Sequence, residues 1–354
     1  PQNISEWVTD LNNGYVKWAD IESDKMMFTL PTSMIGVTNL TNIMTKWGEM
    51  IDLVNTVAGR PLNPIRSEYV LVDCIGGVGA AGYPKLMEEN TYDEALPSTY
   101  WSPLRILEED FVETNQGFIF HELGHNLLFP IPDGHVETVV QMFSVPSYFV
   151  LTNDLEKSIS YAEDETYGRD TGAIAWMITP EFRNNMLMED EHARYQVRGG
   201  AKWFDIVDLF SWEDLGKLNK FFYDKWTTEG GTSLGNSYVE NTEYLQAATE
   251  RIGVNMTPLL NFWGMIPTAG EITTYANYPE SCEIYNRLVY YRNLVPQTQS
   301  EFLPWRDLLL NQVDEVHHDE INDIYSNYDA QNIGDQIVTQ IDYLLATYYL
   351  NGAC

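Results

Sequence analysis

Two histidines and a glutamate stand at the spacing of a metal-binding helix in the first half of the chain. Residues 117–127 read GFIFHELGHNL, with His121 and His125 four positions apart and Glu122 between them. Residues i and i+4 of an α-helix project from one face, so both imidazoles can reach one ion at zinc–nitrogen distances of about 2.0–2.1 Å. Glu122 lies one residue further round the helix, where its carboxylate can accept a proton from a metal-bound water as the catalytic base. The spacing predicts a zinc hydrolase site.

A catalytic zinc site needs a third protein ligand and one position left open for water. Asp133 and Gly134 have the residue types of a helix start, and Glu137 falls in the first turns of the helix expected there. His135 is the alternative ligand, since imidazole also binds zinc. Gln141 follows Glu137 by one helical turn and is placed to brace its carboxylate. The residues alone leave Glu137 and His135 both open.

Each polar pattern also has a purely structural interpretation. The HELGH pattern could arise from two core histidines flanking a surface glutamate. Residues 314–320, DEVHHDE, gather histidines and carboxylates, but such a run is more typical of a solvated helix face than of a metal site. Gly77, Gly79 and Gly82 have the spacing of a phosphate-binding loop, yet Pro84 follows where a helix should begin, so we expect a turn.

The helix that carries the histidines has recognisable ends in the sequence. Thr114 and Asn115 can cap its start, and Pro130 requires it to end before that residue. Apolar residues between these limits give the helix a face to bury. Three ionisable groups on a buried helix cost free energy unless they are paired or bound to a metal. Zinc is therefore the simplest explanation for them.

The pattern of apolar residues divides the chain into two regions. Residues 1–112 contain short strand-like runs, such as Met26 to Leu30 and Tyr69 to Val72, between glycine-rich turns. Residues 113–354 have apolar positions at three- and four-residue spacing, as from Leu215 to Trp226. We expect an α+β protein of zincin type, with a small mixed β-containing N-terminal region and a largely helical catalytic and C-terminal region. The two regions should form one compact catalytic unit.

Charge excludes one class of partner. The 354 residues include 52 Asp and Glu against 20 Lys and Arg, which gives a formal net charge of -32. Such a chain repels phosphate backbones at long range, so we expect no nucleic acid partner. No apolar run approaches the roughly 20 residues that cross a bilayer, so we expect no membrane insertion.

Several weaker signals favour a secreted or cell-surface protein. Pro1 rather than Met at the first position suggests a longer, multidomain precursor with an export signal upstream. Three Asn-X-Ser/Thr sequons begin at Asn3, Asn39 and Asn255, as in a secreted glycoprotein. The three cysteines, Cys74, Cys282 and Cys354, allow one disulfide, for which Cys282 with Cys354 is our candidate pair.

The sequence resembles the enhancin-like, mucin-targeting zinc metallopeptidases, peptidase family M-sixty, of gluzincin type. HELGHN followed by HVETVVQMFS carries the resemblance, and four further segments support it: RSEYVLVD, AAGYP, LFSWEDLGKLNKFFYDKW and RIGVNMTPLLNFWGMIP. Together these segments cover most of residues 15–270. The chain departs from the family in reading LLFP where a Gln is common after HELGHN, and in having Gln141 in place of the usual Asn.

The resemblance implies a zinc peptidase that cleaves O-glycosylated, mucin-like glycoproteins. It implies His121, His125 and Glu137 as zinc ligands, which favours Glu137 over His135, and Glu122 as the base. The two departures concern substrate preference and the surroundings of the ligands, and not the three ligands themselves. The competing hypothesis is a non-catalytic binding or scaffold protein that retains the zincin fold, as in some relatives of this family.

Exposed aromatic rings near the cleft would suit glycan recognition, because their flat faces match sugar rings. Trp212, Trp226 and Trp263 are candidates, although we expect them to pack in the core.

Overall fold

The computed structural model describes most of the chain, and the statements below concern these parts. They are residues 6–7, 9–10, 13–14, 17–32, 35, 39–73, 79–88, 106–108, 117–127, 136–162, 168–184, 186, 188, 196–229, 240–310, 323 and 326–349. Thr114, Asn115, the region 128–135 with His135, and the DEVHHDE run lie outside them. The chain divides into two compact units, residues 1–128 with 140–162 and residues 129–139 with 163–354. The predicted boundary near residue 112 and the single catalytic unit stay predictions.

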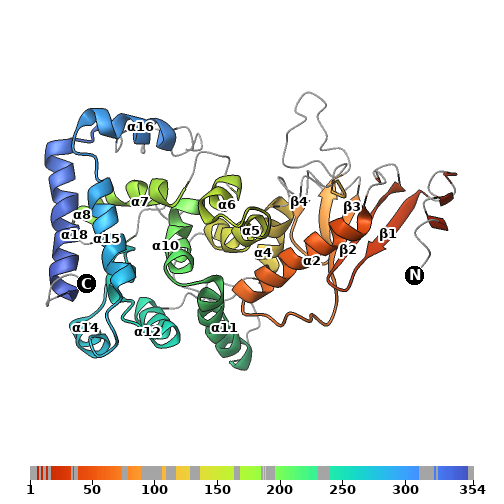
Figure 1. Ribbon diagram of the computed structural model, residues 1–354, viewed down its shortest axis with the longest axis horizontal. Helices are drawn as coiled ribbons and strands as arrows, with labels where there is room; N and C mark the ends of the chain where they lie inside the picture. Colours follow the sequence, from red (N-terminus) through yellow and green to blue (C-terminus); the bar gives the residue numbers. More distant parts are fainter. Residues whose placement is uncertain are drawn as a thin grey trace. The chain divides into compact units, whose positions relative to one another are not determined.

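The first unit is built on a small mixed sheet with strand order β1-β2-β3-β5-β4 (Figure 1). The β1–β2 pair is antiparallel, β2–β3 and β3–β5 are parallel, and β4 is antiparallel to β5 at the edge. Alternate residues of β1 and β2 point inwards, as expected of strands buried on one side. The strands are β1 (Trp18–Glu22), β2 (Met26–Pro31), β3 (Glu68–Asp73), β4 (Gly79–Ala80) and β5 (Lys85–Glu88). Two of them contain the strand-like runs that the sequence predicts.

Helices complete the core of this unit. The ring of Trp47, which has no exposed surface, contacts Phe28 of β2 and stacks on Phe120, with centroid distances of 5.3 and 5.7 Å. One side chain therefore joins the sheet to two helices. The helices of the unit are α2 (Leu40–Val57), α4 (Gly117–Leu127), α5 (Val136–Thr152) and α6 (Leu155–Ala162). Helix α5 crosses the division between the units, after Val139.

In the second unit, all described residues outside the connections are helical. Apolar residues at helical spacing give these helices a face to bury. In helix α18 the buried face consists of Ile337, Ile341, Leu344 and Tyr348. The helices are α7 (Arg169–Met177), α8 (Pro180–Asn184), α10 (Gln196–Leu209), α11 (Trp212–Thr228), α12 (Asn241–Ile252), α13 (Thr257–Phe262), α14 (Ala269–Tyr275), α15 (Cys282–Leu294), α16 (Gln299–Leu310), the π-helical turn η3 (Ala330–Gly334) and α18 (Asp335–Tyr348). The α+β class that the sequence predicts is confirmed.

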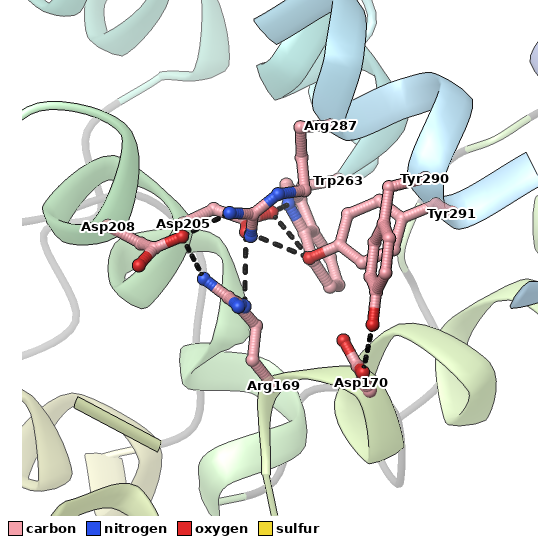
Figure 2. Close-up of polar contacts among 8 residues, drawn as sticks. All are labelled: Arg169, Asp170, Asp205, Asp208, Trp263, Arg287, Tyr290 and Tyr291. Carbon is pink, nitrogen blue, oxygen red and sulfur yellow. Dashed lines mark hydrogen bonds and ion pairs between the residues drawn. The ribbon is translucent and has the colours of Figure 1, made fainter. Parts of the chain in front are cut away.

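A buried cluster of charges joins three helices of the second unit (Figure 2). Asp205 of α10 has no exposed surface and is ion-paired with Arg287 of α15, while Arg169 of α7 pairs with Asp208 at 2.5 Å. Trp263 also donates to Asp205, over 2.7 Å. Complementary charges and neutral donors surround the buried carboxylate, so its desolvation is compensated.

The structure also bears on the predicted disulfide, on one of the sequons and on membrane insertion. Cys282 is disulfide-bonded, but Cys74 and Cys354 lie outside the described residues, so the pair Cys282–Cys354 stays a prediction. The side chain of Asn255 is buried and accepts a hydrogen bond from the Thr257 N–H at 3.0 Å, which leaves it inaccessible to glycosylation in the folded chain. No helix among the described residues combines the length and apolarity needed to cross a membrane.

Candidate metal centre

Helix α4 presents both histidines of the predicted site on one face. The rings of His121 and His125 lie 5.1 Å apart, centroid to centroid, at an interplanar angle of 78°. Both side chains are half-buried, while the next residues on the inward face, Leu123 and Leu127, are buried. The i, i+4 spacing therefore places two imidazoles together at the border between core and surface, as the sequence predicts.

Glu137 comes to the same place from helix α5. One ligand atom each of His121, His125 and Glu137 can be chosen so that all three lie within 4.8 Å of one another. Glu137 is half-buried, and its neighbours Val139 and Val140 are buried on the inner side of α5. Two imidazole nitrogens and one carboxylate oxygen at this separation match the donor set of a catalytic zinc site.

Two glycines set the close approach of α4 and α5. A Cβ added at Gly124 would lie 2.9 Å from the Cβ and the carbonyl oxygen of Val140, closer than real Cβ contacts. One added at Gly117, two turns earlier, would overlap the ring of Tyr148, whose hydroxyl accepts the Gly117 N–H at 3.3 Å. These contacts run in opposite directions along the two helices, so α4 and α5 are antiparallel here. Only glycine permits this spacing.

Helix α4 also contacts the edge of the sheet, next to His125. Asn126, next to His125, donates through Nδ2 to the carbonyl oxygen of Gly82 at 2.8 Å. Gly82 has φ +148° and lies in the bend between β4 and β5, where a side chain would be strained. The predicted turn at these glycines is present at Gly82, whereas Gly79 belongs to strand β4. Asn126 thus fastens the β4–β5 hairpin to the helix of the histidines.

Lys85 is a buried cation near the predicted base. Its side chain is 3% exposed, and its ammonium group donates to Glu68 at 2.6 Å. Burial lowers the pKa of Lys85, because it disfavours the charged form, and Glu68 opposes that effect. The charge of Glu122 opposes it as well, to a smaller degree, so Glu122 and Lys85 lie within electrostatic range. No sequence signal singled out Lys85, since only the packing of β5 on α4 brings it there.

Gln141 lies one helical turn after Glu137 on α5, as the sequence predicts. Its side chain is 5% exposed, and its Oε1 has no hydrogen-bond partner among the described residues. Bracing of the Glu137 carboxylate would come from the amide Nε2, which is the donor, so it stays a prediction.

The tryptophans considered for glycan binding are mostly core residues. Trp212 and Trp263 are 6% and 1% exposed, and Trp263 is bound to Asp205. Trp226 is half-buried. The preference for core packing is confirmed for Trp212 and Trp263.

Comparison with known proteins shows the fold. No protein-family model and no curated protein matches the chain. A functionally unknown conserved protein from Bacillus anthracis str. Ames is similar in structure, with a TM-score of 0.58 at 14% identity over 80% of this chain and 57% of that one. The IMPa metallopeptidase in complex with T-antigen has a TM-score of 0.52 at 14% identity over 78% and 37%.

A metallopeptidase from Bacteroides thetaiotaomicron has a TM-score of 0.52 at 16% identity, over 84% of this chain and 50% of its own. The chain therefore has the α+β fold of known metallopeptidases, and it spans only about half the length of the similar structures, or less.

Proposed function

We propose that this chain is a zinc-dependent endopeptidase of the enhancin-like M-sixty family that cleaves O-glycosylated, mucin-like glycoproteins outside the cell. The observation that carries the proposal is the set of ligand atoms from His121, His125 and Glu137 within 4.8 Å of one another. The fold shared with known metallopeptidases supports a peptidase. The T-antigen bound to one of those structures supports a glycosylated substrate.

The donor set suits a catalytic rather than a structural metal. Three protein ligands of the His, His, Glu type leave one coordination position open, whereas structural zinc sites are closed by four. His121 and His125 from α4 and Glu137 from α5 would hold the ion. When bound, zinc polarises a carbonyl oxygen and lowers the pKa of a water to about 7.

Glu122 is the residue that would move the proton. It follows His121 on α4, is half-buried and is not one of the three grouped residues, so we assign it a place beside the metal rather than on it. It would accept a proton from the attacking water and pass it to the nitrogen of the leaving amine, the two roles of one general acid–base group.

Strand β4 offers a place for the peptide backbone. It stands last in the strand order, and its outer edge has no strand partner among the described residues. An extended peptide can add to such an edge through main-chain hydrogen bonds, which do not depend on the peptide's sequence. The hydrogen bond of Asn126 to Gly82 holds this hairpin next to the helix of His121 and His125. We therefore place the scissile peptide between β4 and α4.

Replacement of the base tests the proposal. We expect Glu122→Gln to keep its zinc, measured by metal analysis of the purified chain, and to lower kcat/KM on an O-glycosylated mucin by about 100-fold or more. Glu49→Gln is the matched control, because Glu49 is an exposed residue of α2 in the same unit. Near-normal cleavage by Glu122→Gln would contradict the assignment.

The same assay, repeated after enzymatic removal of the sugars, tests the substrate class. We expect the mucin to be cleaved and its sugar-free form to be cleaved much more slowly. Equal cleavage of both forms would leave a zinc peptidase but remove the glycoprotein specificity. Zinc binding without cleavage of either form would favour the scaffold hypothesis.

A further inference from the structure

The second unit contains a pocket whose wall carries no charge. Its volume is about 250 Å³, and it is formed by α8, α13, α14, α18 and the connection after α13. None of the residues that the structure places on its wall is charged, although charged residues make up 20% of the chain. An anion would find no cation there, and a cationic ligand would find no carboxylate. The pocket is therefore suited to a neutral ligand.

One side of the pocket is apolar and open to solvent. Tyr343 of α18 is 61% exposed and Ile266 is 40% exposed, and both line the pocket. These side chains expose apolar surface to water, and a ligand could cover it. The face of an exposed tyrosine ring is a flat platform for the apolar face of another ring.

The pocket wall also contains polar groups, which need hydrogen-bond partners on the ligand. Asn261 is 8% exposed and Tyr348 is 7% exposed, and the Asn261 amide donates to the Tyr348 hydroxyl at 2.7 Å. Burial raises the pKa of Tyr348 to about 12, so this hydroxyl stays protonated at neutral pH. Its own proton has no acceptor among the described residues, and the Asn261 carbonyl oxygen can still accept. An entirely apolar ligand would leave the Tyr348 proton and the Asn261 carbonyl oxygen without partners, which costs free energy.

The remaining amides add capacity for hydrogen bonds. Gln340 uses its Nε2 to donate to the Arg183 carbonyl oxygen at 2.6 Å, which fixes the side chain and leaves its Oε1 as an acceptor. Asn184 at the end of α8 is exposed and lines the pocket. Amide groups of this kind both donate and accept, as hydroxyl groups require.

From this wall we infer that the pocket binds one neutral sugar ring. Such a ligand has an apolar face for Tyr343 and hydroxyls for Asn261, Tyr348 and the amides. A volume of about 250 Å³ is smaller than the roughly 300–1,000 Å³ of pockets for drug-sized ligands, and it suits a single ring. None of the residues used here belongs to the candidate metal centre, so the inference goes beyond the proposed peptidase activity and does not depend on it.

Ligand-observed saturation-transfer NMR on the full chain, with galactose and N-acetylgalactosamine as probes, tests the inference. We expect dissociation constants of about 1–10 mM, typical of small polar ligands. The binding should be the same with a zinc chelator present, because no metal ligand lines the pocket. N-acetylneuraminic acid, a charged sugar, should bind at least about tenfold more weakly.

Substitutions locate the binding on the surface. Tyr343→Ala should weaken sugar binding at least about tenfold, whereas Tyr343→Phe, which keeps the ring, should stay within about threefold of wild type. Thr339→Ala is the control, because Thr339 is an exposed residue of the same helix that does not line the pocket. Tyr343 is exposed, so its removal should not prevent folding.

The inference is wrong if neither sugar binds the wild-type chain at a sugar concentration ten times the expected dissociation constant. It is also wrong if Tyr343→Ala binds sugar as tightly as wild type does, or if the chelator removes the binding. The last result would place the sugar at the metal centre. Sugar binding that depends on Tyr343 in a chain without peptidase activity would refute the proposed function alone.

Discussion

Glu137 is the residue on which the proposed metal site most depends. The two histidines belong to one helix and need no tertiary contact to share a face, whereas the third ligand must arrive from elsewhere. Glu137 does so from α5, with a ligand atom within 4.8 Å of those of His121 and His125. His135, the alternative in the sequence, lies outside the described residues. The choice between the two is therefore a matter for measurement.

Paired alanine substitutions distinguish these two residues. We expect Glu137→Ala to weaken zinc binding by more than about 100-fold, because two histidines alone do not complete the site. Loss of a group that only supports a ligand costs roughly 10–100-fold. His135→Ala is expected to retain zinc affinity within about threefold of wild type. Zinc affinity is measured by competition with a chromogenic chelator. If His135→Ala loses zinc and Glu137→Ala keeps it, His135 is the third ligand and Glu137 is not.

At the scale of elements, the site is determined by how closely α4 and α5 pack. Gly124 lies between the two ligands of α4 and meets Val140, which is one turn beyond Glu137 on α5. Any increase in the separation of the helices therefore carries Glu137 away from His121 and His125. Gly124, the small residue within HELGH, therefore affects the geometry of the proposed metal ligands through helix packing and not by binding the metal itself.

Enlarging Gly124 tests this dependence. Gly124→Ala would place its Cβ 2.9 Å from a Val140 carbonyl oxygen, and backbone cannot yield as a flexible side chain can. We expect zinc affinity to fall at least about tenfold and stability to fall by about 1–3 kcal/mol, the usual cost of overpacking. Both are measured by chelator competition and denaturant unfolding.

Gly48→Ala is the matched control, since Gly48 is also inside a helix of the first unit and its added Cβ would meet only Lys25 Cδ, at 3.9 Å. This substitution should leave zinc affinity unchanged and stabilise the chain by up to about 1 kcal/mol through helix propensity. Unchanged zinc affinity in Gly124→Ala would show that the helices adjust without moving the ligands.

The elements also show which features the sequence could predict. The strands at Met26 and Tyr69 and the helices α11 and α18 follow from periodicity that each segment carries by itself. The i, i+4 histidine pair is local in the same sense. The place of Lys85 near Glu122 and the anchoring of Gly82 by Asn126 could not be predicted, because residues 37 and 44 apart in the chain meet only through the packing of the sheet on α4. The bracing of Glu137 by Gln141 stays a prediction, because spacing alone does not determine side-chain conformation.

At the scale of the whole molecule, the second unit depends on charges in its interior. Asp205 accepts from Arg287, from Trp263 at 2.7 Å and from Tyr291 at 2.8 and 2.9 Å, and Arg169 lies 3.8 Å away (Figure 2). These contacts link α7, α10, α15 and the residue after α13. A buried ion pair adds little net stability when intact, but removal of one partner leaves the other charge desolvated and unpaired.

Asp205→Asn should therefore be among the most destabilising single substitutions that keep the shape of a side chain. It removes the fully buried charge that faces Arg287 and Arg169 and leaves the two arginines to share Asp208, whose side chain is 36% exposed. We expect a loss of about 3–5 kcal/mol in the free energy of unfolding. Asp342→Asn is the matched control, since Asp342 also pairs with an arginine, Arg292, but both side chains are substantially exposed. The control should change stability by no more than about 0.5–1 kcal/mol. Denaturant unfolding followed by helical circular dichroism measures both variants. If Asp205→Asn lost no more stability than Asp342→Asn, the helices of this unit would be held by their apolar contacts, and the buried charges would contribute nothing that those contacts do not already provide.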